Sequence, residues 1–312
     1  MKRFIKTLLS FGIFAILFFV VALYLWGNNS HPLLKSNVIY QKGTTGHLNS
    51  RLKEVKDIKN VDLLFLGSSS TYRGFDPRLF EANGFSSFNL GSSAQTPIQT
   101  KVLLKRYLES TNPKRIIYAM NPEVLSMDGV ESALDLIAND TSDANSAKMA
   151  MTIHHVKVYN TFIFASLQQV FGQHMSYQKK SSKGIDTYIS GGFVEREMKY
   201  FDPKTEKKLK TKDITVNYRK DQLKAFEDII NLIQARDIEL ILINAPVTSY
   251  AYNSYTLKQK KQFDDLMSSY ADYIDFNTVL KLQDSLHFYD PYHLNQHGVE
   301  LFNKKVIEII KQ

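Results

Sequence analysis

The sequence predicts an α/β fold with a mostly parallel sheet of about five strands, helices on both faces, a helical insertion and an N-terminal transmembrane helix. Short apolar runs alternate along the chain with segments of helical spacing, which is typical of parallel strands joined by crossover helices. One continuous apolar run near the N-terminus is long enough to cross a bilayer. With 312 residues, 44% of them hydrophobic and 22% charged, the chain has the composition of a globular protein with a substantial core.

The first element is the apolar run over residues 7–26, which follows Lys2, Arg3 and Lys6. Twenty helical residues span about 30 Å, the thickness of the hydrocarbon core of a bilayer. Positive charges before the run and none directly after it predict a single-pass protein of the cell membrane, with a cytoplasmic N-terminus and an extracytoplasmic body. A cleaved signal peptide is the alternative, but the run is long for one and no clear small-residue cleavage pattern follows it. We therefore assign residues 1–30 to a transmembrane anchor.

The rest of the chain is predicted to form a polar stalk over residues 31–60 and an α/β domain over residues 61–312. Buried strands are expected where short apolar runs stand beside turn residues. The predicted strands cover residues 61–66, 86–90, 115–120, 239–244 and 273–276. Helices are expected where apolar residues recur at helical spacing or where proline follows a capping residue. The predicted helices cover residues 77–82, 97–110, 221–235, 256–270 and 294–310. An insertion over about 125–215, helical in its first part, separates the third strand from the fourth.

Charge and cysteine content exclude several classes of protein. The formal net charge is +8, and part of that excess precedes the membrane segment. The remaining excess is mild and suits an anionic membrane or wall-polymer surface, but it is too diffuse to indicate a nucleic-acid-binding protein. The chain contains no cysteine, which excludes disulfides, thiolate zinc sites and a cysteine nucleophile.

Polar residues follow the predicted strands, at the sheet edge where ligands bind in parallel α/β proteins. The sequence GSSST, residues 67–71, comes directly after the first strand. A serine on a tight strand-to-helix turn exposes its hydroxyl above the sheet, and neighbouring backbone N–H groups can hold an oxyanion. Because Gly-Ser runs are also common in loops, this motif is weak evidence by itself.

A second motif, DPYHLN at residues 290–295, precedes the last predicted helix. Asp290 stands three residues before His293 and can accept a hydrogen bond from one ring nitrogen within a turn. That bond fixes the tautomer and leaves the other nitrogen to take a proton from a serine. In the alternative reading, Asp290 only caps the helix and His293 is a surface residue.

Amide donors follow the second and third strands. Residues 89–94, NLGSSA, offer backbone N–H groups, and Asn121 offers a side-chain amide. Together they could complete an oxyanion hole beside a nucleophilic serine, although each is also a common turn signal.

The four blocks, in this order, resemble the SGNH/GDSL hydrolase superfamily. LFLGSSST matches the family's strand followed by G-D-S-x-T, and the resemblance puts Ser69 at the nucleophile. DPYH matches D-x-x-H, which puts Asp290 and His293 at the acid and base positions. NLGSSA matches N-x-G-x-x-G with Ala94 at the oxyanion glycine, and AMNP matches G-x-N-D with Asn121 at the oxyanion asparagine.

The resemblance covers about residues 60–125 and 237–312 and implies a three-layer, flavodoxin-like domain that uses neither a metal nor another cofactor. Ser68, Ala94 and Pro122 depart from the family pattern, which has Asp, Gly and Asp at these positions. The longer string GSSSTYRGFDPRLF is most similar to the membrane-attached bacterial branch, which includes proteins that O-acetylate exopolysaccharides or assist D-alanylation of teichoic acids.

The resemblance therefore implies an extracytoplasmic serine acyl-esterase or O-acyltransferase that acts on esters of cell-surface glycans or polymers. A transferase would receive its acyl group from a membrane-bound donor protein, with a surface polysaccharide or polymer as the substrate. Two alternatives stay open. A catalytically degenerate module that binds or assembles surface polysaccharide would explain the altered second and third blocks, and a metal-dependent phosphoesterase would require several carboxylates near Ser69.

Overall fold

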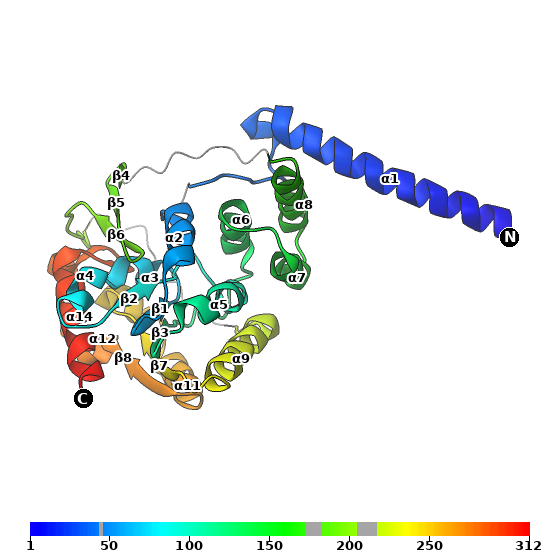
Figure 1. Cartoon of the computed structure of the whole chain (residues 1–312). Helices are drawn as coiled ribbons and strands as arrows, with labels where there is room; N and C mark the ends of the chain where they lie inside the picture. The colour runs from blue at the N-terminus through cyan, green and yellow to red at the C-terminus, as the bar shows by residue number, and fades with distance from the viewer. Residues whose placement is uncertain (44–45, 173–181, 205–216) are drawn as a thin grey trace.

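The computed structural model of the chain describes residues 1–43, 46–172, 182–204 and 217–312. Its centre is a five-stranded sheet in the order β2-β1-β3-β7-β8, with every neighbouring pair parallel (Figure 1). The strands are β1 (Leu63–Leu66), β2 (Ser87–Asn89), β3 (Arg115–Ala119), β7 (Glu239–Asn244) and β8 (Asp272–Asp275). Counted along the chain, this is the flavodoxin-like order 2-1-3-4-5. The predicted fold class is confirmed, and each predicted strand is present.

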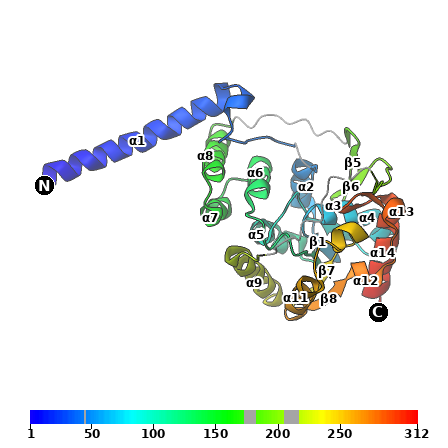
Figure 2. The same cartoon turned by 180° about the vertical axis from the view of Figure 1, so that it is seen from behind.

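Side chains along each central strand alternate between two hydrophobic cores, one on each face of the sheet. On β1, Leu64 and Leu66 belong to one core, while Leu63 and Phe65 belong to the other. Burial on both faces explains why these strands appear in the sequence as continuous apolar runs. The first core is covered by α5 (Pro97–Thr111), α9 (Lys220–Gln234) and α11 (Leu257–Ser268). The second is covered by α4 (Pro77–Glu81), α12 (Phe276–Val279) and α14 (Gln296–Ile310), which gives three layers (Figure 2).

The two helices predicted from a proline at their start, α4 and α5, are each preceded by a capping residue. Asp76 accepts a hydrogen bond from the backbone N–H of Arg78 at 3.1 Å, at the start of α4. Thr96 and Gln99 form a capping box at the start of α5. The other short elements are η1 (Pro32–Leu34), η2 (Val55–Asp57), α3 (Ser69–Gly74), α10 (Ser249–Tyr252), α13 (Asp284–His287), β9 (Phe288–Asp290) and β10 (His293–Leu294).

The insertion differs from the prediction in its second part. Its first part is helical as expected, with α6 (Val130–Asn139), α7 (Ala144–Ile153) and α8 (Val156–Val170). The second part forms an antiparallel sheet of β4 (Ser182–Lys183), β5 (Asp186–Ile189) and β6 (Phe193–Arg196). These strands contain too few apolar residues to produce a recognisable run, and positive φ angles at Gly191 and Gly192 make the tight turn between β5 and β6. Residues 173–181 and 205–216 of the predicted insertion lie outside the described residues.

The predicted polar stalk over residues 31–60 is wrong in its second half. Residues Leu48–Glu54 form α2, and Leu48 and Leu52 are each 1% exposed in the same core as α5. The apolar side chains recur at helical spacing, but the charged residues between them hide this short pattern in the sequence. The α/β domain therefore begins before residue 61.

The N-terminal helix α1 (Lys2–Asn29) projects away from the domain, and its C-terminal end lies beside α8 (Figures 1 and 2). In the described part of the chain it is the one helix whose length and composition suit a membrane crossing. Leu23 packs in a small cluster with Phe164 of α8. The side-chain amide of Gln168 donates a hydrogen bond to Asn28 Oδ1 at 2.7 Å. The end of α1 is therefore docked on the domain.

Candidate active site

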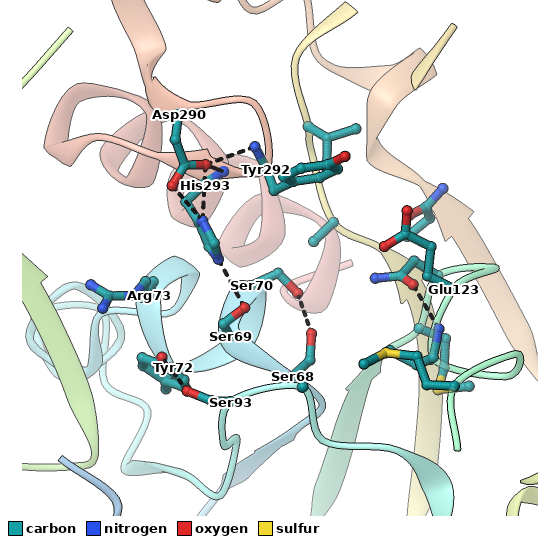
Figure 3. Close-up of a pocket in the computed structure, with 18 of the residues that line it drawn as sticks. Ser68, Ser69, Ser70, Tyr72, Arg73, Ser93, Glu123, Asp290, Tyr292 and His293 are labelled. Carbon is teal, nitrogen blue, oxygen red and sulfur yellow. Dashed lines mark hydrogen bonds and ion pairs between the residues drawn. The ribbon is translucent and has the colours of Figure 1, made fainter. Parts of the chain in front are cut away.

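Loops at the carboxyl ends of the central strands surround a cavity of about 450 Å³ (Figure 3). Ser68, Ser69 and Ser70 line it from the turn after β1 and the start of α3, and Ala94 lines it from the loop after β2. Asn121, after β3, also borders the cavity. The structure thus places every predicted block at one edge of the sheet, as parallel topology requires.

Ser69 is the first residue of α3, directly after a turn that only glycine fits. Gly67 has a φ of 138°, and a Cβ atom there would lie 2.6 Å from the carbonyl oxygen of Ala119. This close approach lets the chain turn sharply from β1 into α3 and leaves the Ser69 side chain at the cavity. The Ser69 hydroxyl lies 2.8 Å from Nε2 of His293 (Figure 3).

Asp290 and His293 are held together by the turn between β9 and β10. Nδ1 of His293 lies 2.9 Å from both carboxylate oxygens of Asp290. Asp290 Oδ1 also accepts the backbone N–H groups of Tyr292 at 2.8 Å and of His293 at 2.9 Å. Burial works to raise the pKa of Asp290, but these hydrogen bonds outweigh it and keep the pKa below its ordinary value. Asp290 is therefore ionised at neutral pH.

The capping alternative for Asp290 does not hold. The residue that caps α14 is Asn295, whose Oδ1 accepts the backbone N–H of Gly298 at 3.1 Å. The ring of Tyr289 stacks on the ring of His293 with centroids 5.5 Å apart and an angle of 6° between the planes. The imidazole is thus fixed by a carboxylate at one nitrogen and by a parallel ring on its face.

The two candidate oxyanion residues border the same cavity as Ser69. Asn121 Oδ1 accepts the backbone N–H of Val124 at 3.1 Å, which orients the amide and leaves its NH₂ group as the donor. Ala94 has a φ of 48°, in the left-handed region that favours glycine. This conformation is a physical reason for a glycine at that position in the motif that the sequence resembles.

Asn89, from the second block, is fully buried and joins two loops of the site. Its amide donates to the carbonyl oxygen of Thr71 at 2.8 Å, and its Oδ1 accepts the N–H of Gly91 at 3.0 Å. Ser68, at the position where the motif has aspartate, lies with its Oγ 3.3 Å from that of Ser70. Asn89 therefore fixes the loop that presents Ser69.

Other residues of the cavity were not predicted from the sequence. Ser93 belongs to the second block, and Tyr72 and Arg73 directly follow the first, so their spacing after Asn89 and Ser69 could have indicated them. Glu131 and Arg196 come from the insertion, where no motif marks them. Within the described ranges, no group of three or more His, Cys, Asp or Glu side chains is placed to hold a metal ion.

Comparison with known proteins shows likeness at the level of fold. No protein-family model matches the chain, and no curated protein sequence matches it. A lipase/acylhydrolase from Enterococcus faecalis is similar at 14% identity and a TM-score of 0.41, over 80% of this chain and 94% of that one. A GDSL-like lipase from Bacteroides thetaiotaomicron is similar at 12% identity and a TM-score of 0.38, over 84% and 94% of the two chains. Because likeness at this level carries no functional information, the function is inferred from the geometry of the site.

Proposed function

We propose that this protein is a membrane-anchored, extracytoplasmic serine acyl-esterase or O-acyltransferase of the SGNH/GDSL type. The observation that supports this most directly is the line of hydrogen bonds from Asp290 through His293 to Ser69, with distances of 2.9 and 2.8 Å. A hydroxyl, an imidazole and a carboxylate in this order are the parts of a nucleophile, a general base and the group that orients the base.

The geometry supports a two-step acyl transfer. The Ser69 oxygen attacks the ester carbonyl carbon while Nε2 of His293 takes the hydroxyl proton, and Asp290 stabilises the resulting imidazolium. The ester C–O bond then breaks, and His293 returns the proton to the departing alcohol oxygen, which leaves an acyl group on Ser69. An acceptor hydroxyl next gives its proton to His293 while its oxygen attacks the acyl carbon. The bond between the acyl carbon and the Ser69 oxygen then breaks, and His293 returns the proton to that oxygen. Water as the acceptor makes the protein an esterase, and a sugar or polyol hydroxyl makes it a transferase.

The tetrahedral oxyanion needs hydrogen-bond donors at the site. Ser69, Ala94 and Asn121 line the cavity, and the backbone N–H groups of the first two and the side-chain amide of the third are the donors we propose for this role. Each donor of this kind typically lowers the barrier by about 3 kcal/mol.

The proposed location follows from α1, which has the length and apolar character of a membrane anchor. Lys2, Arg3 and Lys6 precede its apolar part and favour a cytoplasmic N-terminus. In this arrangement the domain meets polymers of the cell surface, and a membrane-bound partner protein supplies the acyl group if the reaction is a transfer.

A serine-directed fluorophosphonate probe tests the proposal on the detergent-solubilised full chain. We expect labelling at Ser69 in the wild type, none in Ser69→Ala, and labelling slowed at least 100-fold in His293→Ala because the base is lost. Ser70→Ala is the matched control, since this neighbouring serine also lines the cavity but contacts Ser68 and not His293. Absence of labelling in the folded wild-type protein would contradict the enzyme and favour a degenerate module that binds or assembles surface polysaccharide.

A further inference from the structure

Two arginine side chains line the cavity on the side of the small antiparallel sheet. Arg73 lies on α3, one helical turn after Ser69, and Arg196 is the last residue of β6. Both bind the same carboxylate, that of Asp186 on β5. Arg73 donates two hydrogen bonds to it, at 3.0 and 2.7 Å, and Nε of Arg196 donates one at 3.0 Å. Two positive charges thus share one negative charge, so this wall of the cavity carries an excess of one positive charge.

The two guanidinium groups differ in what they have left to donate. Arg73 uses both of its terminal nitrogens on Asp186. The terminal NH₂ groups of Arg196 have no hydrogen-bond partner among the residues that the structure describes. The Arg196 side chain is 27% exposed, at the border of the cavity. It therefore presents a planar pair of donors to whatever enters.

Arg196 is held in place and is connected to the proposed catalytic histidine. Its guanidinium carbon lies 4.5 Å from the centroid of the Tyr289 ring, and Tyr289 stacks on His293. With Nε fixed by Asp186, the side chain is restrained at two points. A restrained guanidinium loses less conformational entropy when it binds a ligand than a mobile surface arginine does.

Acidic side chains also line the cavity, and one of them, Glu123, lies away from Arg73. Figure 3 shows Arg73 and Glu123 on opposite sides of Ser69. Asp290 is hydrogen-bonded to His293, and the charge of Glu123 helps to raise the pKa of Tyr255, after the larger effect of burial. Glu131 is a further carboxylate of the lining. A ligand with a negative group is therefore favoured to place that group on the β6 side of the nucleophile.

We propose that Arg196, together with Arg73, forms a subsite for a negatively charged oxyanion of the substrate, either a carboxylate or a phosphate. A guanidinium donates two parallel hydrogen bonds to such groups, which fixes their orientation as well as their position. The proposal rests on the proposed function and narrows its substrate class to esters on acidic glycans or phosphate-containing polymers.

The test compares the hydrolysis of three acetyl esters by the full chain in detergent: acetylated glucose, acetylated glucuronic acid and acetylated glycerol phosphate. The readout is the ratio of kcat/KM for each acidic ester to kcat/KM for the neutral one, which cancels any general loss of activity. We expect a ratio above one for the preferred acid and a fall of about tenfold in Arg196→Gln, as for loss of a charge-assisted hydrogen bond. The two acidic esters show whether a carboxylate or a phosphate is preferred. Arg236→Gln, an exposed arginine after α9, is the matched control and leaves the ratio unchanged.

A binding measurement separates this proposal from the proposed chemistry. Calorimetric titration of Ser69→Ala with glucuronate and with glycerol phosphate should show binding of at least one of them, weakened about tenfold when Arg196→Gln is added. If Arg196→Gln changes neither the ratio of kcat/KM values nor the binding, the subsite proposal is wrong, while the proposed esterase activity is unaffected. Arg196-dependent binding by a protein that hydrolyses no ester would support the subsite and contradict the esterase.

Discussion

At the scale of single residues, the site contains a backbone conformation that alanine does not favour. Ala94 has a φ of 48°, and a left-handed conformation costs a residue with a Cβ atom about 1–2 kcal/mol. Its backbone N–H is one of the proposed oxyanion donors. Strain of this kind persists where the surrounding structure imposes it, and here the buried amide of Asn89 ties the loop to α3.

Asp135 on α6 makes the stability of the folded protein depend on pH. Burial raises the pKa of its carboxyl group to about 7, although the charge of Arg51 opposes this. Its Oδ2 is buried with no hydrogen-bond partner within the described ranges, while Oδ1 accepts from Asn139 at 2.9 Å. Because the pKa is higher in the folded than in the unfolded state, this group favours folding at low pH. That contribution declines as the pH rises from about 4 to about 7.

Asp135→Asn should therefore stabilise the protein more at pH 8 than at pH 5. We expect the gain in the free energy of unfolding to differ between the two pH values by on the order of 2 kcal/mol, since one pKa unit corresponds to about 1.4 kcal/mol. Urea denaturation of both proteins at each pH measures it. Asp57→Asn, on the exposed end of η2, controls for the loss of one negative charge. A gain that does not depend on pH would refute this reading of Asp135.

At the scale of elements, the sequence predicts best those strands and helices that leave a clear local pattern of apolar or capping residues. The central strands are apolar on both faces, so each produces an unbroken run, and proline with a capping residue marks α4 and α5. The short helix α2 and the strands β4–β6 are stabilised by contacts with distant segments. Their few apolar side chains give no local pattern, and the prediction missed them.

The candidate site likewise contains residues that a local motif marks and residues that only the tertiary structure brings to the cavity. Ser69, Asp290 and His293 belong to short motifs at strand ends, so their spacing indicated them and the structure brings them together. Arg196 reaches the cavity only because β6 pairs with β5 and packs beside α3. No local pattern in the sequence encodes that placement.

The packing of α1 against α8 can also be tested by mutation. A Cβ atom on Gly27 would lie 2.3 Å from the ring of Phe164, so a larger residue forces the ring or the helix to move. Gly27→Leu should cost about 1–3 kcal/mol through overpacking. We expect Tm in detergent to fall by a few degrees and proteases to cut residues 30–40 faster. Gly12→Leu on the same helix is the matched control, because a Cβ atom there has nothing within 4 Å.

At the scale of the whole molecule, the domain and α1 are joined by specific contacts. The Lys35 ammonium group donates to the carbonyl oxygen of Gly27 at 2.6 Å, and the N–H of Ile39 donates to Thr161 Oγ1 at 3.0 Å. The segment after α1 is thus bound to α8 and does not hang as a free tether. These contacts hold the end of α1 against the domain.

A retained anchor and a cleaved signal peptide would leave different surfaces on the domain. Phe164 is 4% exposed because Leu23, Tyr24 and Gly27 lie against it, and removal of α1 would uncover that apolar surface. We expect the protein extracted from membranes of a bacterial host to retain residues 2–30 by intact-mass measurement. We also expect it to stay in the membrane pellet after an alkaline carbonate wash, since twenty apolar residues insert almost irreversibly. A mature chain that begins after Asn29 and is released into the supernatant would show instead that α1 serves only for export.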